Sequence, residues 1–284
     1  MSKFSANFKQ GGTNIFKECC DGVEKFHAHV ASIHSSKLVD CPTEHSFKGH
    51  DNAYNILGDF FKFIHAQYIA KYQELTSAFI ESINSKNYLV AALCGRSIIE
   101  ATATLRWYNQ KILKEVETNG QLDSNSEKFN DKEFIEAALN IINEHMKGSR
   151  FDWSKFFTSD KKTFVNELIE KAKSKEKQVE YPQSLPISRL LDSWSKDMPE
   201  LHFFYDFYSD LVHPNLGSNL LLMGISNNTT QIGENSNKSV GKKICSEAVI
   251  FLAPCLKEAA WQLARSVMLS SLGDPVINSE KNIH

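Results

Sequence analysis

Two short stretches of the sequence carry polar residues whose types and spacing could do chemistry. The first is GRSIIE, in which Arg96 and Glu100 lie four residues apart within an apolar segment. Side chains at this spacing share one face of a helix, and the guanidinium group of arginine suits the binding of phosphate. Because an isolated buried charge is costly, we expect the pair either to join two helices or to face a cleft.

The second stretch is FYDFYSDLVHPNLG, residues 204–217, where an aromatic segment stops at His213 and Pro214 follows. Proline cannot continue a helix and disfavours helical geometry in the residue before it, so His213 is predicted at a helix end. An imidazole there could act as a general base or only cap the helix. Four further polar residues gather at this end as candidate binding residues: Tyr205, Tyr208, Ser209 and Asn215.

These two stretches are the main polar interruptions of otherwise apolar helical patterns. Buried polar groups require partners, and we therefore expect His213 to lie close to Arg96 and Glu100 in one pocket. In a catalytic version of this pocket, Arg96, Glu100 and His213 would be the reacting residues. In a structural version they would form a buried polar network that fixes the register of the helices.

The N-terminal stretch ECCDGVEKFHAHVASIHSSKLVDCPTEHSFKGH contains residue types that bind metals, but not at the spacing of a metal site. It holds three cysteines and five histidines, but no paired CxxC or HxxxH set. A structural zinc site has tighter spacing than this. We expect no metal site there, and the sequence indicates no cofactor, since glycine-rich phosphate loops, nucleophile elbows and two-carboxylate motifs are lacking.

Composition sets outer limits on function. The chain has 284 residues, a formal net charge of -2 and a pI near 6.6, so any contact with nucleic acid would need a local basic patch. No stretch reaches the length of uncharged apolar residues needed to span a membrane, and the first residues lack the apolar core of a signal peptide. We expect a cytoplasmic protein that does not associate with membranes.

Apolar periodicity predicts an all-α protein built as a bundle of long antiparallel helices. Residues 51–82, 86–117 and 243–272 repeat apolar side chains every three or four positions and are predicted to form the core. A small hairpin insertion is predicted near residues 219–232. Residues 1–50 are predicted to be an irregular segment, with at most a short helix near 15–31 and little part in the core, whereas 51–284 form the bundle domain.

The segments ALCGRSIIEATATLRW and FYDFYSDLVHP together resemble HEPN-related helical proteins of bacteria, which carry an Arg-x-x-x-Glu helix and a Tyr/Ser-x-x-x-His-Pro helix end. The resemblance covers roughly residues 51–272. It implies a helical bundle, often dimeric, and a metal-independent ribonuclease of a toxin–antitoxin or phage-defence system. The six residues before His213 contain no arginine, so the resemblance requires Arg96 to supply the positive charge.

Two classes of function remain open from the sequence. One is an RNA-cleaving bundle in which His213 moves a proton while Arg96 neutralises the phosphate. The other is a non-catalytic helical module that binds a protein. The expected partners are accordingly RNA, a protein such as an antitoxin, or a second copy of the chain in a homodimer.

Overall fold

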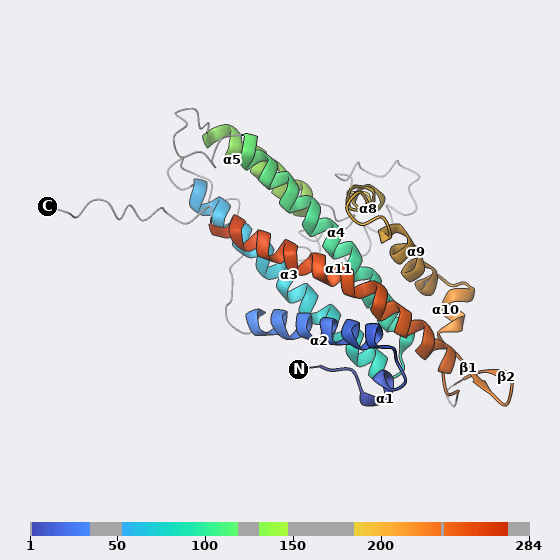
Figure 1. The fold of residues 1–284 in the computed structure, drawn as a ribbon. Coiled ribbons are helices and arrows are strands. Elements are labelled where there is room, and N and C mark those ends of the chain that lie inside the picture. The colour runs from blue at the N-terminus through green and yellow to red at the C-terminus, as the bar shows by residue number, and fades with distance from the viewer. Residues whose placement is uncertain (1, 35–52, 119–130, 147–184, 234–235, 272–284) are drawn as a thin grey trace, which may run out of the picture.

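The computed structural model describes residues 2–34, 53–118, 131–146, 185–233 and 236–271. These residues form nine helices and a single two-stranded antiparallel hairpin (Figure 1). The predicted all-α bundle is therefore confirmed. The stretch around residues 151–177, for which the sequence suggests a charged helix, lies outside the described residues.

Three long helices form the centre of the bundle. They are α3 (Ala53–Asn84), α4 (Tyr88–Thr118) and α11 (Ser239–Ser271), which match the three predicted core helices to within a few residues. A tight turn joins α3 to α4, with Lys86 at φ 60°. In Figure 1, α11 lies along both α3 and α4, and it continues as a helix through Pro254.

The helix α4 is the most enclosed of the three. It packs against α3, α11, α5, α8 and α9, and buried side chains occur on nearly every side of it. Among the described residues, it is the one helix long and apolar enough to cross a membrane, and 61% of its apolar window is buried inside the bundle. Such burial is typical of a core helix, which passes the same test of length and composition.

The N-terminal segment differs from the expectation. Rather than an irregular stretch outside the core, it forms α1 (Ala6–Lys9) and a 21-residue helix, α2 (Asn14–His34), which packs against α3 and α11. The following residues of this segment are buried in the common core: Phe4, Phe8, Phe16, Cys20, Val23, Phe26 and Val30. The last five recur at three- and four-residue spacing, a helical period that the interspersed charged residues obscured.

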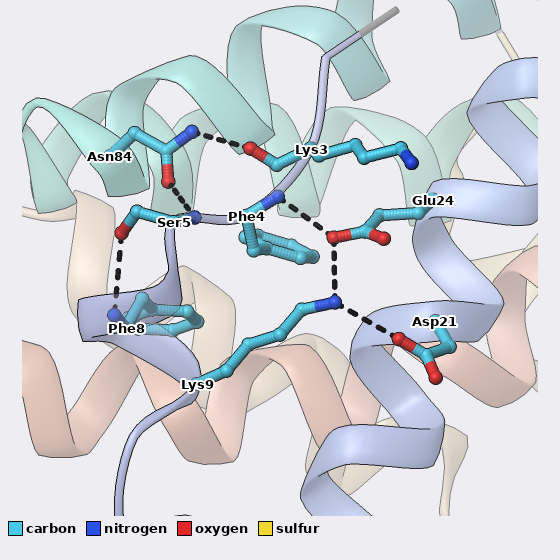
Figure 2. Close-up of polar contacts among 8 residues, drawn as sticks. All are labelled: Lys3, Phe4, Ser5, Phe8, Lys9, Asp21, Glu24 and Asn84. Atoms are coloured by element: carbon cyan, nitrogen blue, oxygen red, sulfur yellow. Dashed lines mark hydrogen bonds and ion pairs between the residues drawn. The ribbon is translucent and has the colours of Figure 1, made fainter.

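Polar contacts hold the start of the chain against α2 and α3, as Figure 2 shows. Oε1 of Glu24 accepts a hydrogen bond from the backbone N–H of Phe4 (2.8 Å) and forms an ion pair with Nζ of Lys9 (2.9 Å). Asn84, at the end of α3, accepts the backbone N–H of Ser5 and donates to the backbone carbonyl of Lys3. These bonds satisfy backbone groups that no helix pairs, and so fix the two N-terminal phenylalanines in the core.

Three shorter helices pack against α4: α5 (Asp131–Met146), α8 (Ile187–Trp194) and α9 (Leu201–Val212). The short helix α10 (Leu216–Leu220) packs against α9, and the hairpin of β1 (Met223–Ser226) and β2 (Thr229–Ile232) follows it, with β1 against α11. Asn227 and Asn228 both have positive φ, as a two-residue hairpin turn requires. The hairpin predicted near residues 219–232 is therefore confirmed.

Candidate functional site

The helix α9 and its C-cap His213 carry four of the seven predicted site residues, and the position of α9 on α4 depends on Gly95. The ring of Tyr208 occupies the space that a Cβ atom at Gly95 would fill. The Tyr208 hydroxyl donates a 2.6 Å hydrogen bond to the backbone carbonyl of Ala248 in α11. Tyr208 is fully buried, and burial raises its pKa well above the usual value. This predicted binding residue is thus a packing residue that joins three helices.

Arg96, Glu100 and Tyr205 meet on the seam between α4 and α9. Nε of Arg96 donates to Oε1 of Glu100 (2.9 Å), and Nη2 donates to the Tyr205 hydroxyl (3.0 Å). The Tyr205 hydroxyl donates in turn to the same Oε1 (2.9 Å), and the guanidinium group lies 5.3 Å from the Tyr205 ring centre. The three side chains form a closed cluster, which we call the seam cluster.

The seam cluster is partly exposed, and its hydrogen bonds shift the pKa values of Arg96 and Tyr205. Partial burial alone would lower the pKa of Arg96, but the hydrogen bonds with Tyr205 and Glu100 outweigh it and raise the pKa. Burial raises the pKa of Tyr205, as does its bond to Glu100. At neutral pH the cluster therefore holds a cationic guanidinium and a protonated phenol.

His213 is not part of the seam cluster. It follows the last residue of α9 with an extended backbone, its N–H bonds to the carbonyl of Ser209, and its side chain is exposed. Eight residues separate it from Tyr205, which on a helix is about 12 Å along the axis and roughly 80° around it. The structure thus brings Arg96 and Glu100 together with Tyr205 and leaves His213 at the far end of the helix.

The two remaining predicted residues serve local structure. Asn215 is the N-cap of α10: its side chain accepts from the N–H of Ser218 and donates to Asp210 (2.6 Å). Ser209 faces inward, and its hydroxyl is buried without a hydrogen-bond partner in the described part of the chain. Neither side chain hydrogen-bonds to the seam cluster in the described structure.

The outer face of α9 is a feature that the sequence interpretation passed over. Phe203, Asp206 and Asp210 are exposed, and their spacing of three and four residues places them on one stripe. Phe203 is 60% exposed, although its ring contacts Phe251 of α11, which also stacks on Phe204. We call this exposed stripe the outer face. Its signal in the sequence was FFYDFYSD, an aromatic helix with acids and no base.

A second charged group lies inside the bundle and was also missed. Arg106 of α4 is 7% exposed and donates to Glu258 of α11 (2.6 Å) and to Asp197, in the turn after α8. Beside it, Asn109 donates to Gln262, which itself donates to Glu258 (2.7 Å). The arginine in ATATLRW interrupts an apolar helix in the same manner as Arg96. Its deep burial and its pairing to two carboxylates indicate a structural role.

In the described ranges, no three side chains from histidine, cysteine, aspartate or glutamate come close enough to hold a metal ion. Cys20 is buried and His27 hydrogen-bonds to Thr76 across α2 and α3, so two residues of the predicted loop cluster are core residues instead. Cys41, His45 and His50 lie outside the described residues.

Residues 62–230 match the model of a family of unknown function (DUF5677), and the chain belongs to this family. The match spans α4, the seam cluster and the whole of α9. No curated protein and no solved structure matches the chain significantly.

Proposed function

We propose that this protein is a non-catalytic helical module that binds another protein through the outer face of α9. The observation that carries the proposal is the exposed Phe203, which is backed by the packed rings of Phe204 and Phe251 and flanked by Asp206 and Asp210. Rigid, exposed aromatic side chains are typical energetic centres of protein interfaces. A fixed helix presents this one without a cost in ordering the binding surface.

The charges of the outer face favour a protein partner over RNA. The helix α9 contains two aspartates and no lysine or arginine, and the exposed Glu200 precedes it. Phosphate groups approaching this surface would meet carboxylates, whereas RNA binding depends on basic residues. The complementary partner is a segment rich in lysine or arginine that also carries an apolar side chain to cover Phe203. We place this interaction in the cytoplasm.

The experiment compares capture of partners by immobilised full-length variants. Phe203→Ser removes the aromatic anchor and Asp206→Lys reverses the charge beside it, while Trp261→Ser is the matched control. Trp261 is 57% exposed on α11, ten residues beyond Phe251, which is about 15 Å along the helix axis. We expect the wild type and the control to retain a basic protein that both α9 variants lose. The affinity of the purified basic protein for the wild type should fall as the salt concentration rises.

Two outcomes would contradict the proposal. One is equal capture by the wild type and the two α9 variants. The other is a partner whose binding does not depend on salt and which lacks a basic segment. Sedimentation of the purified chain tests whether the outer face binds a second copy of the chain. A dimer that dissociates in the Phe203→Ser variant would show that it does.

A metal-independent ribonuclease of the HEPN-related type is the second candidate. One observation favours it: the exposed His213 imidazole has no hydrogen-bond or ion-pair partner in the described part of the chain, so an RNA backbone could reach it. RNA sequencing after induced expression tests it, with His213→Ala as the expected inactive variant and Arg96→Ala as the test of whether the seam cluster takes part. Cleavage that persists in both variants, or no cleavage by the wild type, rules out this candidate.

A further inference from the structure

A cavity of about 940 Å³ lies between α3, α4, the end of α5 and α8, away from the outer face of α9. Polar and apolar side chains line different parts of this cavity. Tyr68, Lys71 and His145 lie on α3 and α5, and Leu75, Ile187 and Leu190 supply apolar walls from α3 and α8. This volume suits an organic molecule of moderate size, and mixed lining of this kind is typical of small-molecule sites.

Lys71 is the one cationic side chain among the described lining residues. Its ammonium lies 5.1 Å from the centre of the Tyr68 ring, and it makes no ion pair with the described residues. Lys71 is exposed at the edge of the cavity, and partial loss of water around its ammonium group lowers its pKa. His145 cannot share the positive charge, because burial and the neighbouring Lys71 lower its pKa to about 4. An acidic group in the cavity would therefore pair with Lys71.

Glu100 supplies a hydrogen-bond acceptor to the same cavity. Its Oε1 receives both bonds of the seam cluster, whereas its Oε2 accepts no hydrogen bond from the described residues. Arg96 and Tyr205 hold the carboxylate in place from the α9 side. The spare oxygen is thus a fixed acceptor, while much of the carboxylate's charge is offset by Arg96.

We propose that the cavity binds a small organic acid that carries a hydroxyl or amine group at its other end. The acid pairs with Lys71, the donor group bonds to Oε2 of Glu100, and the aliphatic body packs against Leu75, Ile187 and Leu190. The exposed carboxylate of Glu144 also lines the cavity and opposes a second negative charge on the ligand. The site therefore favours monoanions over dianions.

Calorimetric titration of the full-length protein with four six-carbon probes tests each contact separately. The probes are 6-hydroxyhexanoate, 6-aminohexanoate, hexanoate and hexylamine, and four- and eight-carbon hydroxy acids extend the series in length. We expect one of the two bifunctional probes to bind about tenfold more tightly than hexanoate or hexylamine, which each lack one contact. Which of the two it is distinguishes a hydroxyl from an amine.

Four variants assign the contacts. Lys71→Met should weaken all acids about tenfold, whereas Lys111→Met, an exposed lysine of α4 outside the cavity, should leave them unchanged. Glu100→Met should reduce the bifunctional probes to the affinity of hexanoate. Because this change also releases Arg96, Tyr205→Phe is its control: it breaks the seam cluster but leaves Oε2.

Three results would overturn the proposal: no binding at millimolar probe concentrations, no advantage of a bifunctional probe over hexanoate, or unchanged affinity in Lys71→Met. Circular dichroism and urea unfolding are measured on the same Lys71→Met protein. An unchanged spectrum and midpoint show that the variant is folded, so loss of acid binding reports on the cavity alone.

Discussion

The ring of Tyr208 lies directly against Gly95, in space that any larger residue would require. This contact brings α9 close enough to α4 for Tyr205 to reach both Arg96 and Glu100. The seam cluster thus depends on a glycine in the middle of a helix, where glycine itself is unfavourable by about 0.5–1 kcal/mol.

Gly95→Ala tests this dependence. Alanine normally stabilises a helix, but here its Cβ would collide with Tyr208, and overpacking of this kind costs about 1–3 kcal/mol. We expect lower stability in urea unfolding, and partial recovery when Tyr208→Leu is added. The control Gly22→Ala lies in α2, where an added Cβ meets no atom, and should stabilise. A stabilised Gly95→Ala protein would show that α9 does not pack as closely as described.

The two arginines of α4 should differ in their effect on stability. Arg106 is 7% exposed and pairs with the largely buried Glu258 and the exposed Asp197, so Arg106→Ala should lower the free energy of unfolding by about 3 kcal/mol, the lower end of the range for a broken buried pair. Arg96 is partly exposed, and Arg96→Ala should cost about 1 kcal/mol or less. Urea unfolding of both variants gives the comparison. Equal losses would mean that the seam cluster is as buried as the Arg106 network.

Truncation of an N-terminal phenylalanine tests the place of this segment in the core. Phe8 is 4% exposed, and Phe8→Ala should destabilise the protein by about 3–5 kcal/mol. Phe203 is 60% exposed, and Phe203→Ala is the matched control, with an expected effect within about 0.5 kcal/mol. Thermal and urea unfolding of the pair suffice. If both variants lost equally little stability, the N-terminal segment would not be packed in the core.

Stability should fall as the pH drops below the ordinary pKa of histidine. The folded pKa of His145 is about 4, chiefly through burial, against an ordinary value of 6.5. Between these values the unfolded chain binds a proton that the folded one does not, so unfolding is favoured as the pH falls from 6.5 to 4. The full effect is about 3 kcal/mol and levels off below pH 4.

Urea unfolding across this pH range, on the wild type and His145→Gln, measures that effect. Burial also lowers the pKa of His27 and His65, so part of the slope will remain in the variant. The difference between the two profiles belongs to His145. Identical slopes would show that His145 takes up its proton equally in both states.

The sequence predicts the long helices well and the site poorly, for physical reasons. The apolar repeats of α3, α4 and α11 extend over many turns, so their period is unambiguous. In α2 the same period is present, but Cys20 and Val23 lie among many charged residues. The core position of α2 depends on distant partners in α3 and α11, which no local pattern reveals.

Within the site, too, contacts between residues close in sequence were predictable and contacts between distant residues were not. Arg96 and Glu100 are four residues apart in one helix, so their contact was readable from the sequence. Their third partner, Tyr205, lies over a hundred residues away, and the choice between it and His213 depends on how α9 lies on α4. The cavity beside Glu100 depends on four separate helices and leaves no local trace in the sequence.

The position of α11 also sets an order of assembly. This helix packs against α2, α3, α4 and α9, all of which precede it in the chain, and Figure 1 shows it lying along the middle of the bundle. More than 150 residues separate the end of α3 from the start of α11, so during synthesis the surfaces of α2 and α3 that α11 covers stay exposed until those residues have been made. Contacts so distant in sequence slow folding and leave apolar surface open to chaperones or aggregation until the final long helix arrives.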